Sequence, residues 1–126
     1  MNPKEYIKNV LKTESSDFPE IGKRLNTVKS IRLLHGSIGV ATESGELLDA
    51  IKKHLFYGKP LDEVNLKEEI ADCLWYISVM LDELDSSFEE VMETNIEKLK
   101  ARYGDKFNEE GAVNRDLKIE REILEK

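Results

Sequence analysis

Two pairs of carboxylates are the residues of this sequence most able to do chemistry. Glu43 and Glu46 form one pair, Glu69 and Asp72 the other, and within each pair the acids are three residues apart. This spacing puts both acids of a pair on one face of a helix. The chain has 26 acids, however, and the spacing recurs elsewhere, in the pairs Glu90 with Glu93 and Glu122 with Glu125. Spacing alone is therefore weak evidence for a site.

The neighbouring residues separate these pairs. Glu122 has Lys118 four residues before it, and Glu125 has Arg121, so local ion pairing accounts for both. None of the four acids in the first two pairs has a Lys or Arg three or four residues away. Asp72 also lies inside an apolar run, where an unpaired carboxylate would be strongly disfavoured.

A short turn around Gly58 would let the helices that carry the two pairs pack together. Four carboxylates brought together need a cation, because two like charges ~4 Å apart repel by about 4 kcal/mol at an effective dielectric constant near 20. An all-oxygen set favours Mg²⁺ or Mn²⁺ over zinc. The residues alone leave an alternative open, in which these acids are solvated or paired through tertiary contacts.

A polar face further along the chain suits phosphate. Asn95, Lys98 and Arg102 follow helical spacing, and an amide with two cations can contact phosphate oxygens. Taken alone, this face is better explained by ion pairs between Lys98 and neighbouring acids. Lys53 is a further phosphate candidate, although Asp49 lies four residues before it and could pair with it.

The apolar periodicity predicts an all-α fold, a helical bundle of four main helices followed by a C-terminal helical extension. Asn2 with Pro3 marks the start of the first helix, and the segment 15–19 ends it. A long second helix is expected from Ile21 to Phe56, although its glycines weaken the prediction that it is unbroken. The third helix is expected to begin with a capping box at Asn65 and to include the apolar run from Ile70 to Leu81. The fourth is expected from a capping box at Ser86 to Gly104, and the C-terminal extension over Ala112–Lys126. The apolar run predicts that the third helix is the most buried.

Size and composition limit the class of protein. With 126 residues and 14.5 kDa, the chain is expected to form a single domain over residues 1–126. The net charge of −7 argues against a nucleic-acid partner. One cysteine, Cys73, excludes an intrachain disulfide. Without an export signal or a long apolar run, we expect no membrane partner and a cytoplasmic location.

Taken together, the motifs resemble the MazG-like all-α nucleotide pyrophosphohydrolases, a family that includes dimeric dUTPase and dCTP pyrophosphatase relatives. The pattern E-x-x-E followed by E-x-x-D is met by the two acid pairs, with 22 residues between Glu46 and Glu69. The resemblance runs over residues 33–107, with 108–126 as an extension. It departs from the expected pattern at Ala71, where Gly would precede the Asp. The segments that carry the match are Glu43–Leu47, Lys52–Lys53, Glu68–Tyr76 and Asn95–Tyr103.

The resemblance implies hydrolysis of a nucleoside triphosphate, with a dNTP expected, between its α and β phosphates. It implies that Mg²⁺, or Mn²⁺, is held by the four acids, and that Glu46 helps to activate water. It also implies a homodimer or homotetramer. The residues implied to bind substrate are Tyr76 in the nucleotide pocket and, on the phosphates, Lys53, Asn95, Lys98 and Arg102.

Two alternative functions remain open at this stage. One is a noncatalytic helical module that binds metal or nucleotide for regulation, and the other is a phosphoribosyl-ATP pyrophosphohydrolase. The base cannot be identified from the sequence, because base selectivity depends on the shape of the pocket and on a few hydrogen bonds.

Overall fold

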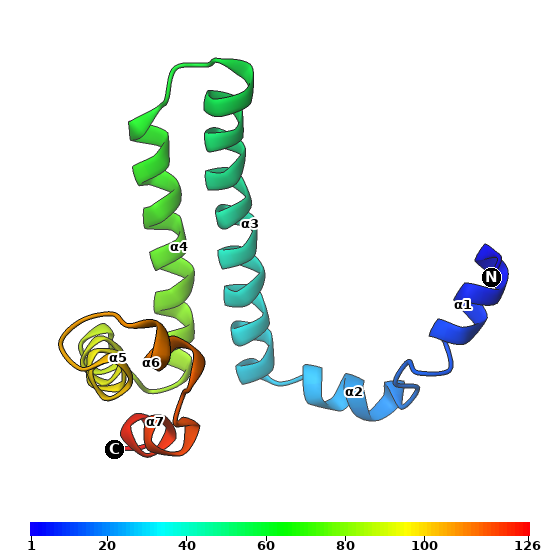
Figure 1. Ribbon diagram of the computed structural model, residues 1–126. Helices are drawn as coiled ribbons and strands as arrows, with labels where there is room; N and C mark the ends of the chain where they lie inside the picture. Colours follow the sequence, from blue (N-terminus) through cyan, green and yellow to red (C-terminus); the bar gives the residue numbers. More distant parts are fainter.

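A long antiparallel helical hairpin is the centre of the molecule. The computed structural model describes all residues from Met1 to Lys126. Helix α3 (Val28–Tyr57) begins at Thr27, whose hydroxyl accepts a hydrogen bond from the Ser30 amide at 3.0 Å, and it ends at Gly58. A short turn then leads into α4 (Glu63–Glu83), which runs back alongside α3 (Figure 1). The predicted pairing of these two helices is confirmed.

Two glycines let α3 and α4 approach closely. Gly36 and Gly39 are the buried residues of α3. A Cβ atom at Gly39 would overlap the ring of Tyr76, and one at Gly36 would overlap the side chain of Met80. The glycines do not interrupt this helix, because α3 is continuous from Val28 to Tyr57 and these two glycines make room for side chains of α4.

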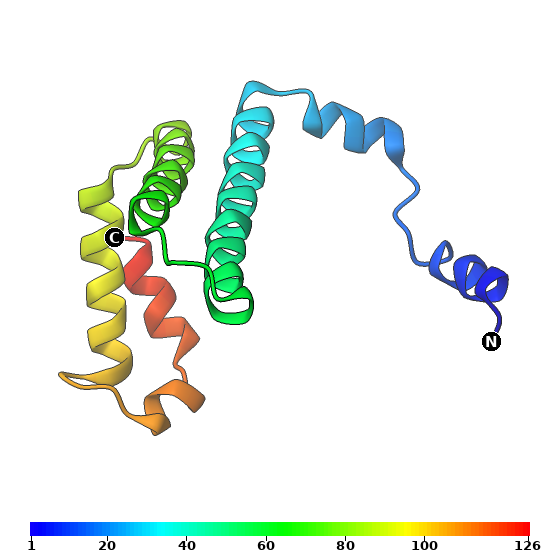
Figure 2. The same ribbon diagram turned by 90° about the horizontal axis from the view of Figure 1, so that it is seen from above.

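The N-terminal segment forms an arm of two short helices. Helices α1 (Pro3–Val10) and α2 (Phe18–Leu25) extend away from the hairpin (Figure 2). The prediction of one helix from Ile21 to Phe56 was wrong at its start. Asn26 leaves helical geometry with ψ of 49°, and Thr27, with ψ of 149°, caps α3 as a separate helix.

The C-terminal part forms a second hairpin. Helix α5 (Phe88–Tyr103) ends at Gly104 as predicted, and α6 (Glu109–Val113) and α7 (Leu117–Leu124) fold back against it. The expected single helix over Ala112–Lys126 was wrong, since the chain breaks at Asn114 and Asp116 caps α7.

Two predicted helix starts also lie at other residues than expected. Asp62, not Asn65, caps α4, because the Asp62 carboxylate accepts hydrogen bonds from the amides of Val64 and Asn65. Ser87, not Ser86, caps α5. The first correction lengthens α4 by three residues at its start, the second shortens α5 by one, and the order of the elements is unchanged.

The predicted all-α class is confirmed, since the structure consists of seven helices and no strand, but one chain leaves its apolar faces uncovered. No hydrophobic side chain is fully buried. As predicted, the third helix of the sequence analysis, α4, has the largest share of residues that are not exposed, but its Ile70, Leu74 and Trp75 are still 51%, 48% and 56% exposed. The accessible area is 10354 Å², whereas a compact folded monomer of 14.5 kDa would expose about 6,900 Å². None of the helices combines the length and apolar character needed to cross a membrane.

Candidate active site

Three of the four predicted acids meet between α3 and α4. Glu43 of α3 and Glu69 and Asp72 of α4 each offer a carboxylate oxygen, and these oxygens all lie within 4.8 Å of one another. We call these three residues the acidic cluster. Helical spacing puts Glu69 and Asp72 on the face of α4 that contacts α3, and the close approach at Gly39 brings Glu43 to them.

The acidic cluster has no cation to balance it. No ion pair of the structure involves Glu43, Glu69 or Asp72, although Glu69 is only 5% exposed. The side-chain donors to the acidic cluster are neutral: the Asn65 amide lies 2.7 Å from Glu69 Oε1, and the Thr42 hydroxyl lies 3.5 Å from Glu43 Oε1. Burial raises the pKa of Glu43, and the adjacent Glu69 carboxyl and repulsion from Glu46, Glu69 and Asp72 raise it further.

The donor set of the acidic cluster fits a hard divalent cation. Its three side chains offer only carboxylate oxygens, which suit Mg²⁺ or Mn²⁺, and neither the cysteine nor a histidine joins them. A bound cation would also reduce the repulsion among these acids, of which Glu69 is buried, Glu43 half-buried and Asp72 exposed. The residues present therefore fit the metal that the sequence predicts.

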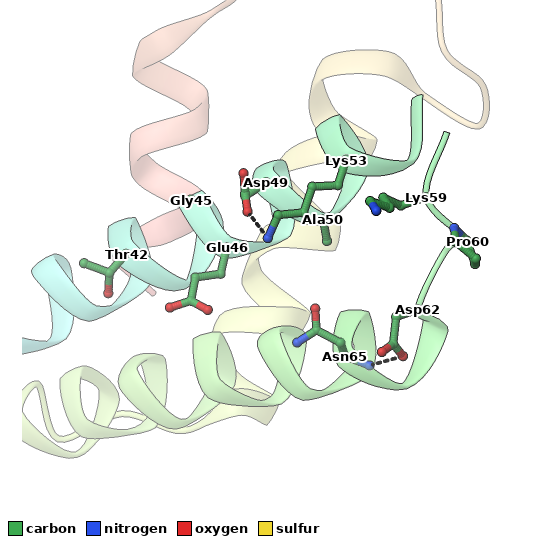
Figure 3. A pocket seen from close by; sticks show the side chains of 10 residues that line it. All are labelled: Thr42, Gly45, Glu46, Asp49, Ala50, Lys53, Lys59, Pro60, Asp62 and Asn65. Carbon is green, nitrogen blue, oxygen red and sulfur yellow. Dashed lines mark hydrogen bonds and ion pairs between the residues drawn. The ribbon is translucent and has the colours of Figure 1, made fainter. Parts of the chain in front are cut away.

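Glu46 lies beside the acidic cluster and not within it. One turn after Glu43 along α3, it is exposed and lines a pocket of about 440 Å³ (Figure 3). The structure thus groups three of the four predicted metal ligands and puts Glu46 at the edge of the site. Its roles as metal ligand and as water-activating base both remain predictions.

The predicted substrate residue Tyr76 lies on the other side of the acidic cluster. Its ring packs on the backbone at Gly39, and together with Trp75 it lines a pocket of about 360 Å³ that also includes Glu43 and Asp72. The rings of Tyr76 and Trp75 meet edge to face, with their centroids 4.9 Å apart.

Sequence reasoning missed Trp75 as a site residue, because a tryptophan within an apolar run is most simply explained by packing. The structure leaves it 56% exposed at the wall of this pocket. The signal that could have found it is position, since Trp75 lies three residues after Asp72 and so on the same helical face. His35, the third ring of the group, lies 6.3 Å from Trp75 and 5.5 Å from Tyr76 between centroids.

Lys53 is both paired and located at the candidate site. Its ammonium group lies 2.6 Å from Asp49, which also binds Lys52 at 2.6 Å, so the local ion pairs expected from the spacing are confirmed. The two lysines hold the pKa of Asp49 at about 2. Lys53 also lines the pocket of Glu46, and its contact with phosphate remains a prediction.

The three predicted phosphate residues of α5 lie away from the acidic cluster within one chain. Helix α5 packs against α6 and α7, on the side of α4 that faces away from α3 (Figure 2). The Arg102 guanidinium group donates two hydrogen bonds to the Glu120 carboxylate, at 2.8 and 2.6 Å. The structure thus gives Arg102 another partner than phosphate, while Asn95 and Lys98 remain predictions.

Comparison with known families agrees with this geometry. The MazG nucleotide pyrophosphohydrolase domain matches residues 37–107, more than half of the chain. This chain belongs to the MazG family. The matched residues of this chain include the acidic cluster, the residues that line both pockets beside it, and all of α5. Neither a curated protein nor a solved structure matches the chain. Membership in the family indicates the general activity of a nucleotide pyrophosphohydrolase.

Proposed function

We propose that this MazG domain hydrolyses a nucleoside triphosphate, with a deoxynucleotide as the expected substrate, between the α and β phosphates. The products are the nucleoside monophosphate and pyrophosphate. The observation that carries the proposal is the acidic cluster, in which a nearly buried Glu69 has acids and one amide for neighbours and no cation. Such a group is costly unless a divalent cation joins it, and Mg²⁺ characteristically recruits phosphate oxygens.

The residues of the site divide the work of hydrolysis. Glu43, Glu69 and Asp72 would hold Mg²⁺, or Mn²⁺, which supplies charge neutralisation on the phosphates and lowers the pKa of bound water. Glu46, at the edge of the acidic cluster, accepts a proton from the attacking water. The water oxygen forms a bond to one phosphorus of the α–β anhydride, the bond from that phosphorus to the bridging oxygen breaks, and the monophosphate and pyrophosphate separate.

The aromatic pocket is the expected site of the nucleoside. Trp75 and Tyr76 offer ring faces and edges directly beside Glu43 and Asp72. A base that lies against these rings places its phosphates over the acidic cluster. Stacking of a base on an aromatic ring contributes roughly 1–3 kcal/mol without selecting one base strongly.

The active form is a homo-oligomer, a dimer or a tetramer, in this proposal. The chain exposes roughly 3,500 Å² more than a compact monomer of its mass, or roughly 7,000 Å² for two chains together, and obligate interfaces bury about 2,000–5,000 Å² or more over both partners. The excess includes the apolar residues of the arm, such as Tyr6, Ile7 and Phe18, which are 61%, 57% and 60% exposed. Copies of the chain that cover each other's apolar faces would supply the missing core.

A product analysis tests the proposed function. The protein is incubated with each common NTP and dNTP in the presence of Mg²⁺, and the products are separated by ion-exchange chromatography. We expect repeated turnover of at least one nucleotide to its monophosphate with one pyrophosphate per monophosphate. Release of single phosphate, or binding without any product, would contradict the proposal, and the second outcome would favour a regulatory binding module.

A further inference from the structure

A second set of groups lies at the turn between α3 and α4, next to the acidic cluster. The pocket of about 440 Å³ at this turn is bordered by Glu46 on α3 and Asn65 on α4 (Figure 3). The Asn65 amide donates to Glu69, a member of the acidic cluster. The pocket therefore begins where the acidic cluster ends.

The charges that line this pocket are not equally available. Asp49 already binds Lys52 and Lys53, and Asp62 accepts two backbone hydrogen bonds at the start of α4, at 3.1 and 3.0 Å. Lys59 also lines the pocket, and no ion pair of the structure involves it. Among the cations of the pocket, Lys59 is thus the one whose charge no carboxylate has neutralised.

The backbone of Lys59 is held in place on both sides. Gly58 before it adopts a left-handed conformation, with φ of 66°, which ends α3. The Lys59 amide donates to the Lys53 carbonyl at 3.2 Å, and its own carbonyl lies 2.8 Å from Nδ1 of His54. Pro60 follows and fixes its own φ. Because this backbone is already ordered, little further ordering of the turn is needed when a ligand binds to Lys59.

The acidic cluster lies between two pockets of different chemistry. On the side of Tyr76, Trp75 and Tyr76 line the aromatic pocket together with Glu43 and Asp72. On the side of the turn, Lys53 and Lys59 line the polar pocket together with Glu46. A nucleoside triphosphate has the same order of parts, with an aromatic base at one end and the most negative phosphates at the other.

We propose that Lys59 binds the terminal phosphates of the substrate, so that the triphosphate lies along the α3–α4 groove with its pyrophosphate end at the turn. This inference rests on the proposed function and assigns a substrate-binding residue to it. Lys59 supplies a direct charge-assisted hydrogen bond, and Lys53 adds a second positive charge that Asp49 partly neutralises. The pyrophosphate group then leaves from the polar pocket, while the monophosphate stays beside the aromatic rings.

The test compares Lys59→Ala with Lys59→Arg and with Lys29→Ala. Lys29 is an exposed lysine at the opposite end of α3 and lines neither pocket, so it is the matched control. For the substrate found in the product analysis, we expect Lys59→Ala to raise KM and the inhibition constant of pyrophosphate by about 10-fold or more. Inhibition by the nucleoside monophosphate should stay unchanged, Lys59→Arg should restore most of the affinity, and Lys29→Ala should behave as wild type. Equal pyrophosphate inhibition in wild type and Lys59→Ala would overturn the inference.

A binding measurement keeps this result separate from the proposed function. Pyrophosphate is titrated calorimetrically into wild type and Lys59→Ala in the presence of Mg²⁺, with thermal unfolding as a check that both are folded. If no nucleotide is hydrolysed, the proposed function fails, while weaker pyrophosphate binding by Lys59→Ala still supports the role of Lys59. If wild type does not bind pyrophosphate, or both proteins bind it equally, the role of Lys59 is refuted even when turnover is observed.

Discussion

The molecule has two nearly buried glutamates, one in each hairpin, with opposite surroundings. Glu69 of α4 and Glu120 of α7 are both 5% exposed. Glu120 accepts hydrogen bonds from Arg102 and Arg115, which hold its pKa at about 2. Glu69 has the Asn65 amide and two further acids beside it.

This difference separates a structural carboxylate from a candidate functional one. Two cations from the chain itself satisfy Glu120, so its charge stabilises the contact between α5 and α7. Glu69 lacks such partners, and only a group from outside the chain can neutralise the acidic cluster. Burial alone does not separate the two, whereas the neighbours of each carboxylate do.

The largest expected effect is that of Glu69→Gln on turnover. The amide keeps the shape of the side chain but removes a negative charge from the acidic cluster, so we expect turnover to fall by more than about 100-fold. Since the change also removes repulsion, thermal stability without metal should be equal to or above that of wild type. Turnover near the wild-type rate would show that the acidic cluster is not the site of reaction.

Glu120→Gln should lower stability and leave turnover intact, the opposite of Glu69→Gln. It leaves two arginines without their carboxylate, so thermal unfolding should begin at a clearly lower temperature, while turnover per folded molecule is retained. Glu122→Gln is the control, because Glu122 is an exposed acid of the same helix whose ion pair with Lys118 spans 4.0 Å. A loss of turnover in Glu120→Gln without a loss of stability would contradict the structural role of Glu120.

Gly39→Ala tests the close approach that assembles the acidic cluster. The added methyl group overlaps the Tyr76 ring, and overpacking of this kind costs about 1–3 kcal/mol in the free energy of unfolding. Gly45→Ala is the matched change, since a Cβ there meets no atom within 4 Å, and it should stabilise α3 by about 0.5–1 kcal/mol. Urea unfolding of both variants measures the difference. Equal stability of the two would show that α3 and α4 do not pack as described.

The smallest expected effect is on the pH dependence of stability without metal. The pKa of Glu120 is lowered from an ordinary 4.5 to about 2. Its contribution to the free energy of unfolding is therefore present above pH 4.5 and is lost as the pH falls from about 4.5 to about 2. The raised pKa of Glu43 acts in the other direction, because this contribution is present at low pH and is lost as the pH rises through the raised value.

Urea unfolding of wild type, Glu120→Gln and Glu43→Gln, measured from acidic to neutral pH, separates the contributions of Glu120 and Glu43 to stability. The stability difference between wild type and Glu120→Gln should shrink as the pH falls. Relative to wild type, Glu43→Gln should become more stable as the pH rises. Parallel curves for all three proteins would contradict the pKa shifts of both residues.

The sequence predicted the acidic cluster better than it predicted the helix ends. Helical spacing and turn signals were enough to predict the acidic cluster. The spacing put Glu69 and Asp72 on one face of a helix, and the turn at Gly58 brought that helix back alongside Glu43. The same rules misplaced the start of α4, since Asp62 and Asn65 both fit a capping position and only the three-dimensional structure shows which one accepts the backbone bonds.

Long-range partners lay beyond the sequence pattern. Arg102 was a reasonable phosphate residue from its spacing, but it binds Glu120, 18 residues further along the chain. The exposure that α4 retains also depends on long-range partners. The apolar run of α4 indicates that this surface must be covered, and in one chain only α3 packs on it closely.

Binding of Mn²⁺ to the protein without nucleotide tests the central claim most directly. Electron paramagnetic resonance of the free ion gives the bound fraction as Mn²⁺ is titrated into wild type, a Glu69→Gln/Asp72→Asn variant and Glu120→Gln. We predict saturable binding to wild type and to Glu120→Gln, and its loss in the double variant. Equal binding to all three proteins, or none to wild type, would show that the three acids between α3 and α4 do not form a metal site.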